Sequence, residues 1–431
     1  MKKLIQLKLK FLAKIILRKY SPKIIGITGS VGKTSTKEAI FNVLSSKFNT
    51  RESIKNYNNE LGVPLSIIGV VSPGRSLFGW AFVFFKALKL ILFKDKKYPE
   101  FLVLEFGVDR PGDMKYLTSI AKCDVGVITT IGPSHLEFFK TVKNTQKEKG
   151  VLIKDLKRDG WAILNYDDEM TKELKDEAKT KILTYGFHSE ANVRAQNLVF
   201  SFEENRDINN MSGISFKLNH DGSVVPIKLP RVIGYSAIYS SLAAASVGIA
   251  YKMNLVEISD ALRNYYLPCG RMNLIKGIKN TLIIDDSYNS SPQSSISAID
   301  FIKKIDLDGN GRKWAVLGDM MELGSYTEEG HREVGQALQK GGFDKLITVG
   351  ERARDIARGA REGGMRKEDV YSFDRNIESG KFIQERMEEG DLILIKGSQG
   401  ARVEKIVKEI MADPMNAKNL LVRQGKEWRD K

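Results

Sequence analysis

Short runs of β-branched and aliphatic residues alternate with helix-forming segments along almost all of the 431 residues. Strands that are separated by helices pair in parallel through right-handed crossovers. The pattern therefore predicts an α/β fold with mostly parallel sheets, and a chain of this length is expected to form two or three domains. The predicted strands are residues 23–28, 101–105, 125–130, 161–164, 182–185, 281–285, 314–317, 345–349, 370–373 and 391–395.

The first predicted strand runs directly into a glycine loop, TGSVGKT, residues 28–34. Ile27 stands where the common G-x-x-x-x-G-K-[ST] loop has its first glycine. Glycines still allow the backbone to wrap a phosphate, and the next helix offers free N–H groups and its positive dipole end. Lys33 can neutralise phosphate oxygens, and the Thr34 hydroxyl can bind Mg²⁺. The predicted phosphate-binding residues are Thr28, Gly29, Ser30, Val31, Gly32, Lys33, Thr34 and Ser35. A glycine turn with a chance Gly-Lys-Thr is the alternative, and the flanking strand and helix argue against it.

Acidic and imidazole side chains follow two further predicted strands. Glu105 ends strand 101–105, and His135 and Glu137 follow strand 125–130. Ligands bind at the carboxyl ends of parallel strands, so these residues are candidate metal ligands. Glu105 could equally cap a loop or pair with a cation, and a lone histidine is more often structural.

The net charge of +15 favours anionic partners, although a solvated basic surface is an open alternative. The first twenty residues hold seven Lys or Arg and no acid. No nucleic-acid recognition motif accompanies this charge, so we expect no nucleic-acid partner. Two cysteines far apart and four scattered histidines give no disulfide framework and no zinc motif, which is typical of the reducing cytoplasm.

Two segments have the composition of surface-binding helices. Residues 1–20 form a basic amphipathic pattern, and residues 76–93 are apolar except for Lys86 and Lys89. The second segment is short for a membrane span. Both could lie on the inner face of a membrane, bind a cell-wall enzyme, or pack on each other or on the domain.

Ordered motifs from residue 22 to residue 412 resemble those of the Mur ligases of peptidoglycan synthesis. They include TGSVGKT, NNELGVP (58–64), LEFGVDRPGD, IGPSHLE, GRMNLI, IIDDSYNSSPQS (283–294), VLGDMMELG (316–324) and LIKGSQGARVE (394–404). The resemblance implies a P-loop ATPase domain with a mostly parallel sheet and a C-terminal Rossmann-like domain. We expect the boundaries 1–21 for the basic helix, 22–268 and 269–412 for the two domains, and 413–431 for a weakly packed tail.

The resemblance also implies a reaction. In this family ATP phosphorylates a peptide carboxylate, and an amine attacks the acyl phosphate to give an amide, ADP and phosphate. The later motifs are most similar to the branch that adds D-alanyl-D-alanine to a UDP-muramoyl-tripeptide. Such enzymes close their two domains over the substrates, with catalytic residues from both sides.

Residue roles follow from matching motifs. The resemblance implies one Mg²⁺ on Thr34 and Glu105, and a second on His135 and a carbamate of Lys149, although an unmodified Lys149 could instead pair with phosphate. The implied catalytic residues are Lys33, His135, Lys149, Arg271 and Asp286. Arg271 and Asn289 are expected to join the loop in nucleotide binding, with Tyr288 beside them. The implied substrate residues are Asn58, Asn59, Asp319, Glu322, Lys396 and Ser398.

The chain departs from the family pattern in three places. About twenty residues precede the first strand, too few for the UDP-sugar domain of the D-alanyl-D-alanine ligases, and residues 76–93 look like an insertion. Ser236, Ala237 and Ser240 stand at the His and two Asn positions that contact adenine in relatives. Gln399 replaces the arginine that usually follows K-G-S, which removes a carboxylate clamp.

These departures leave two rivals to the D-alanyl-D-alanine ligase. One is a related ligase for another carboxylate, as in poly-glutamate or cyanophycin-type synthesis. The other is a non-catalytic ATP-binding scaffold in a cell-wall complex. Intact Lys33, Thr34, Glu105, His135 and Lys149 argue against the scaffold.

Overall fold

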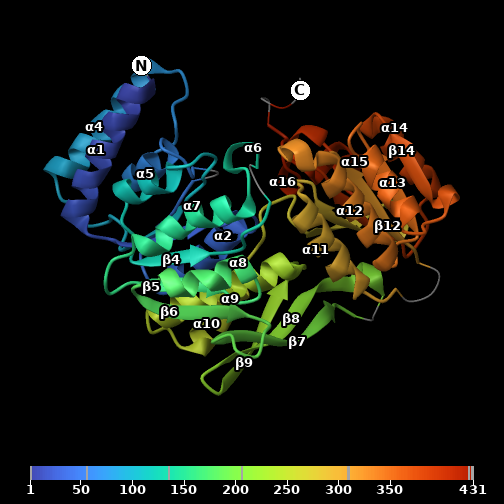
Figure 1. Ribbon diagram of the computed structural model, residues 1–431, viewed down its shortest axis with the longest axis horizontal. Coiled ribbons are helices and arrows are strands. Elements are labelled where there is room, and N and C mark those ends of the chain that lie inside the picture. The colour runs from blue at the N-terminus through green and yellow to red at the C-terminus, as the bar shows by residue number, and fades with distance from the viewer. Residues whose placement is uncertain are drawn as a thin grey trace. The chain divides into compact units, whose positions relative to one another are not determined.

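A computed structural model describes residues 2–54, 57–133, 136–204, 207–307, 311–425 and 428, and Figure 1 labels its helices and strands. The chain divides into two compact units. The first comprises Met1–Asn197, Phe216–Ile227 and Ile238–Tyr265, and the second comprises Leu198–Ser215, Lys228–Ala237 and Tyr266–Lys431. The boundaries 1–21, 22–268, 269–412 and 413–431 remain a proposal.

The first sheet has nine strands in the order β2-β3-β1-β4-β5-β6-β7-β8-β9, and neighbouring strands from β2 to β7 are parallel. All five residues of β3 and all four of β4 are buried, as expected for strands covered on both faces. The strands are β1 (Lys23–Thr28), β2 (Thr50–Glu52), β3 (Phe101–Glu105), β4 (Val125–Ile128), β5 (Trp161–Asn165), β6 (Lys181–Gly186), β7 (Val193–Phe202), β8 (Met211–His220) and β9 (Ser223–Pro230).

Helices alternate with these strands along the chain. The Asn254 side chain caps α10 and the Thr141 side chain caps α7, which satisfies N–H groups at the two helix starts. The helices are α1 (Lys2–Tyr20), α2 (Lys33–Ser45), α3 (Gly62–Ile68), α4 (Leu77–Leu92), α5 (Asp113–Ile120), α6 (Leu136–Phe139), α7 (Val142–Lys154), α8 (Glu169–Lys172), α9 (Tyr235–Ala250) and α10 (Leu255–Leu262).

The two segments with surface-binding composition form α1 and α4, which lie side by side in Figure 1. Leu9, Ala13 and Ile16 of α1 are fully buried, in the same hydrophobic cluster as Leu102 and Leu104 of β3. The basic N-terminal helix is therefore part of the first unit's core, although its other face stays exposed.

Strands β8 and β9 are consecutive in the chain and adjacent in the sheet, so they form a hairpin. Strands β8 and β9 are joined by only Asp221 and Gly222, whose φ angles are 47° and 78°. Positive φ at both positions is the requirement of a two-residue hairpin turn, which aspartate and glycine meet at low cost.

The second sheet has six strands in the order β10-β11-β15-β12-β13-β14. Strand β10 is antiparallel to β11, and the other pairs are parallel. The strands are β10 (Asn273–Gly277), β11 (Thr281–Asp286), β12 (Lys313–Gly318), β13 (Lys345–Val349), β14 (Val370–Phe373) and β15 (Leu392–Lys396). The helices are α11 (Pro292–Lys303), α12 (Thr327–Lys340), α13 (Arg354–Glu362), α14 (Asn376–Arg386), α15 (Glu404–Ile410) and α16 (Ala417–Leu420).

The predicted α/β class is confirmed, and each predicted strand lies within two residues of an observed one. The predicted strands did not include β2, β7, β8, β9 or β10, and β2 has only three residues, too few for a pattern. Among the described residues, no helix is long and apolar enough to cross a membrane.

The expectation of a weakly packed tail is wrong for its described part. Ala417 and Leu421 are buried in the core of the second unit. Arg423 pairs with the buried carboxylate of Glu404 at 2.9 Å and donates to the carbonyls of Ser287 and Tyr288. The tail therefore supports the segment that follows β11.

Replacing Leu9 tests whether α1 belongs to the core. Leu9→Ala removes a fully buried side chain and should lower the free energy of unfolding by roughly 2–5 kcal/mol. The matched control Leu7→Ala changes the same side chain at a position 61% exposed, so its effect should stay within about 0.5 kcal/mol. Chemical denaturation measures both, and equal effects would contradict the packing of α1.

Candidate active site

The glycine loop between β1 and α2 has a backbone that only glycine can adopt. Gly29 has φ 153°, and a Cβ atom there would lie 1.9 Å from the Thr129 hydroxyl oxygen. Gly32 has φ 85° and immediately precedes the first residue of α2. Both glycines of the predicted phosphate loop are therefore required by its shape. Thr129, which the sequence did not single out, donates its hydroxyl to the Val31 carbonyl at 2.5 Å and holds the loop from β4's side.

Lys33, at the end of the loop, forms hydrogen bonds with residues at its beginning. The Lys33 amine donates to the carbonyls of Gly29 at 2.8 Å and Ser30 at 3.3 Å. Ser30 is fixed in turn, because its N–H donates to the Thr130 carbonyl at 2.7 Å. The predicted loop residues thus form one connected structure at the carboxyl end of β1.

The register of the sheet brings Glu105 to this loop. Ile27 of β1 lies opposite Glu105 of β3, so the end of β3 is level with the start of the loop. The Thr34 hydroxyl donates to Glu105 Oε2 at 3.1 Å, and the Asn58 amide donates to Oε1 at 3.1 Å. Glu105 is only 3% exposed.

Thr34 and Glu105 fit a magnesium ion by their chemistry. A hydroxyl and a carboxylate are the hard oxygen donors that Mg²⁺ prefers, and they already converge at hydrogen-bond distance. Within the described part of the chain no group of three or more His, Cys, Asp or Glu could hold a metal. His135 lies outside the described residues, and Glu137 is exposed on α6.

Lys149 lies buried against the same loop. Its amine donates to the Gly29 carbonyl at 3.1 Å, and its side chain is 2% exposed. Burial, followed by the positive charge of Lys33, lowers the pKa of Lys149 to about 7. An amine with this pKa is largely neutral above pH 7, which an ordinary lysine is not.

Other predicted residues of the first unit have structural contacts. The Asn59 side chain accepts from the N–H groups of Leu61 and Gly62 at the start of α3. Ser35 is buried, and its carbonyl accepts from the Tyr265 hydroxyl at 3.0 Å. Ser240, in the altered adenine region, shares a hydrogen bond of 3.1 Å with Thr36 of α2.

The second unit gathers predicted residues at the carboxyl ends of β11 and β15. Asp286 and Lys396 lie opposite each other in the parallel register, and their side chains pair at 2.6 Å. The Lys396 amine also donates to the Asn289 carbonyl at 3.0 Å. The Arg271 guanidinium lies 4.2 Å from the centre of the Tyr288 ring, a cation–π contact.

The third group surrounds the segment after β12. The Ser398 hydroxyl accepts from the Met321 N–H at 2.9 Å and donates to the Ser290 carbonyl at 3.2 Å. Asp319 accepts from the Ala353 N–H at 2.8 Å. Glu322 has φ 64°, so the backbone turns sharply at this predicted substrate residue.

His331 holds this segment and was missed by the sequence reasoning. It is fully buried on α12, accepts from the Met320 N–H at 3.0 Å through Nε2, and contacts the Thr327 carbonyl at 2.6 Å through Nδ1. These contacts need a neutral ring with its proton on Nδ1. Burial lowers the pKa of His331, which favours the same form. A lone histidine in the sequence gives no sign of this role.

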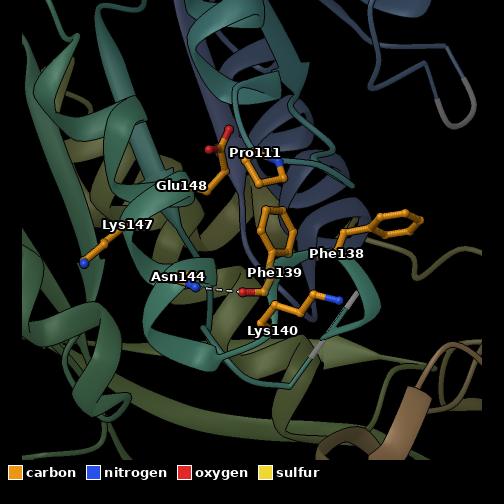
Figure 2. A pocket seen from close by; sticks show the side chains of 7 residues that line it. All are labelled: Pro111, Phe138, Phe139, Lys140, Asn144, Lys147 and Glu148. Atoms are coloured by element: carbon orange, nitrogen blue, oxygen red, sulfur yellow. Dashed lines mark hydrogen bonds between the residues drawn. The ribbon is translucent and has the colours of Figure 1, made fainter.

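A pocket of about 310 Å³ lies next to α7 in the first unit, and Figure 2 shows the side chains that line it. The Glu148 carboxylate accepts from the Gly112 and Met114 N–H groups and fixes one wall. The lining residues are Pro111, Phe138, Phe139, Lys140, Asn144, Lys147 and Glu148. None of them belongs to the predicted site, so this described pocket is separate from the phosphate loop's contacts.

Two family models match the chain. The Mur ligase middle domain matches residues 27–74 and 86–248, and the Mur ligase, glutamate ligase domain matches residues 270–399. Together these ranges include every predicted site residue.

Similar proteins come from several bacteria. The UDP-N-acetylmuramoyl-tripeptide--D-alanyl-D-alanine ligase of Bacillus subtilis is 29% identical over 405 residues, which cover 94% of this chain and 79% of the relative. The MurF crystal structure from Acinetobacter baumannii has a TM-score of 0.77 at 26% identity and covers 95% of this chain and 80% of that one. The MurF ligase of Thermotoga maritima in complex with ADP has a TM-score of 0.75 at 26% identity, with 94% and 83% covered.

His331 makes stability depend on pH. Because the fold lowers its pKa, the unfolded chain binds a proton at His331 more readily, so stability is lost as the pH falls through about 6.5. His331→Gln retains an acceptor for the Met320 N–H and cannot titrate. We expect the wild type to lose more unfolding free energy than His331→Gln between about pH 7.5 and about pH 5.5. His188→Gln, at an exposed histidine, is the control. A variant with the full wild-type loss would contradict this role.

Proposed function

Since the chain belongs to the Mur ligase family, we propose that it is an ATP-dependent amide ligase of peptidoglycan precursor synthesis that joins D-alanyl-D-alanine to UDP-N-acetylmuramoyl-tripeptide. The observation that carries this proposal is the geometry of the glycine loop: Lys33 and Lys149 both donate to the Gly29 carbonyl, and Thr34 donates to Glu105. The name of the Bacillus subtilis relative, which matches 94% of the chain, supports the choice of substrates.

The loop is proposed to bind the phosphates of ATP. The helix α2 begins directly after Gly32, so its first N–H groups and the positive end of its dipole face a bound phosphate. Lys33 would exchange its contacts with the loop carbonyls for phosphate oxygens. The ADP named in the Thermotoga maritima complex supports this choice of nucleotide.

Magnesium is proposed at Thr34 and Glu105, and a second ion at His135 and a carbamate of Lys149. Bound Mg²⁺ would offset the negative charge that gathers when ATP and a carboxylate meet. Asn58 would hold the Glu105 carboxylate in position through its amide, which donates to Oε1. This makes Asn58 a positioning residue in our proposal as well as a candidate for substrate contact.

The chain's own chemistry makes Lys149 able to form the carbamate. A neutral amine attacks the carbon of CO₂, forms an N–C bond and releases one proton. At a pH near 7.4 an ordinary lysine is neutral in only about one molecule in a thousand. A lysine with a pKa of about 7 is mostly neutral there, which favours the proposed modification.

The proposed reaction has two steps. A carboxylate oxygen of the tripeptide attacks the terminal phosphorus of ATP, and ADP leaves. The D-alanyl-D-alanine nitrogen then attacks the acyl carbon, phosphate leaves and the amine loses its proton. From the family's motifs we assign nucleotide contacts to Arg271 and Asn289, and catalysis to Asp286. Asp319, Glu322, Lys396 and Ser398 would contact substrate.

Location and partners extend the same proposal. We propose a cytoplasmic enzyme that works beside a membrane surface or a cell-wall enzyme, held there through residues 1–20 and 76–93. The free cysteines Cys123 and Cys269 are compatible with a reducing compartment.

Phosphate release tests the proposed function directly. Purified protein is supplied with ATP, Mg²⁺, UDP-N-acetylmuramoyl-tripeptide and D-alanyl-D-alanine, and each component is left out in turn. We expect release that requires all of them and falls by at least about a hundredfold in Glu105→Gln, which removes one charge from the metal site. Release that ignores the peptides would point to another carboxylate, and none at all would favour the scaffold.

Lys149 can be tested without turnover. With ¹³C-labelled bicarbonate, the protein should show a carbamate signal in ¹³C NMR that weakens as the pH falls below about 7, where the amine is protonated. Lys149→Met should lose the signal. Lys147→Met, on the exposed side of the same helix, should keep it. A signal in Lys149→Met would remove Lys149 from the second metal site.

A further inference from the structure

Helices α1 and α4 expose a large apolar surface. We call it the apolar face, and it consists of exposed side chains from both helices and from the residue after α4. On α4, Phe78 is 91% exposed and Leu77 is 77% exposed, values that soluble proteins rarely give to neighbouring large side chains. The apolar face comprises Leu4, Leu7, Phe11, Leu77, Phe78, Phe82, Phe85, Leu88, Leu92 and Phe93.

The opposite sides of both helices are fixed in the core. Val83 and Ala87 of α4 are buried in the same cluster as Leu9 and Ala13 of α1. The helices run in the same direction, because Lys19 and Tyr20 at the end of α1 donate to the Leu90 carbonyl near the end of α4. The apolar face is therefore a rigid surface of the first unit and cannot fold inward to bury itself.

The two segments that carry the apolar face are rich in basic residues. Residues 1–20 contribute seven Lys or Arg and no acid, and residues 75–97 contribute six with Asp95 as the single acid. Lys89 is exposed and lies on the same side of α4 as Phe82 and Phe85, since positions three and four apart are neighbours on a helix. A lysine in that place can lay its alkyl chain along the apolar surface while its charged amine reaches water.

The ligase reaction gives no reason for these residues. The family model for the middle domain stops at residue 74 and resumes at residue 86, so Leu77, Phe78, Phe82 and Phe85 lie outside the match. The described contacts of the phosphate loop involve none of the ten residues of the apolar face. Seven of the ten residues of the apolar face thus lie outside the family match, and Leu88, Leu92 and Phe93 lie within it.

From these observations we infer that the apolar face binds an anionic lipid membrane, into whose interface Phe78, Phe82 and Phe85 insert. This inference makes the proposed location beside a membrane more specific. It rests on the proposed function only for the biological role of the binding. Helix α4 is about 24 Å long, shorter than the roughly 30 Å hydrocarbon core, so it would lie in the plane of the interface. The lysines around it would meet lipid phosphates.

Charge complementarity decides between a membrane and a second copy. Two copies joined through this surface would bring the exposed cations of one chain, among them Lys14, Arg18 and Lys89, against those of the other, and like charges at an interface oppose association. An anionic membrane satisfies both the apolar groups and the lysines.

Vesicle sedimentation of the full chain tests the inference. We expect the protein to sediment with vesicles of phosphatidylcholine and phosphatidylglycerol, to bind phosphatidylcholine alone at least about tenfold more weakly, and to dissociate as salt is raised. The triple variant Phe78→Ser, Phe82→Ser, Phe85→Ser should lose at least about tenfold in binding, because three exposed aromatic rings no longer insert. The triple variant Lys8→Glu, Lys14→Glu, Arg18→Glu should weaken binding to the anionic vesicles and leave binding to phosphatidylcholine vesicles unchanged.

Matched controls remove the same kinds of side chain elsewhere. Val256→Ser, Ile377→Ser, Met415→Ser deletes three exposed apolar groups, and Lys217→Glu, Lys381→Glu, Lys408→Glu reverses three exposed charges. Both should bind vesicles like the wild type. The inference is overturned if the wild type stays in the supernatant, if controls and variants lose binding equally, or if the serine variant changes only a dimer seen by light scattering.

The vesicle assay contains no ATP and no peptide, so it can fail or succeed independently of ligase activity. The Phe78, Phe82 and Phe85 triple variant should keep wild-type phosphate release in the absence of vesicles. Binding without ligase activity would contradict the proposed reaction alone, and activity without binding would contradict the membrane surface alone.

Discussion

Two lysines share one carbonyl oxygen, and the first unit's site depends on that arrangement. Lys33 and Lys149 both donate to the Gly29 carbonyl, at 2.8 Å and 3.1 Å. Two full positive charges this close in a buried site repel each other strongly, so the more buried amine gives up its proton more easily. Burial is the main cause of the lowered pKa of Lys149, and the positive charge of Lys33 lowers it further. The residue that supplies this carbonyl must be glycine, because a Cβ atom there would lie 1.9 Å from the Thr129 hydroxyl oxygen.

The second unit also places ionisable side chains at the carboxyl ends of its strands. Two consecutive acids end β11, and the alternation of a strand sends their side chains to opposite faces. Asp286 meets Lys396 across the parallel register, whereas Asp285 is fully buried and its pKa is raised to about 7 by burial. Asp286 is therefore paired with a lysine, whereas Asp285 is partly protonated near neutral pH.

The sequence predicted the strands and the phosphate loop well because both are local patterns. Residues 23–28 carry continuous apolar character, and the glycines of TGSVGKT are unambiguous turn residues. It could not predict His331 or Arg423, since their roles depend on residues that are distant or structurally unmarked. Arg423 meets Glu404 and the carbonyl of Tyr288, 135 positions away. Nor could composition decide whether residues 1–20 would be core or surface, because the helix is both.

The burial of α1 has a consequence for how the chain is made. Leu9, Ala13 and Ile16 emerge from the ribosome long before Leu102 and Leu104, their partners in the core. At typical synthesis rates this gap of more than eighty residues lasts roughly 5–20 seconds. During that time the inner side of a nineteen-residue helix has nothing to pack against, and an isolated helix of this length is marginal in water. Helix α1 consequently reaches its final environment only after β3 has been made.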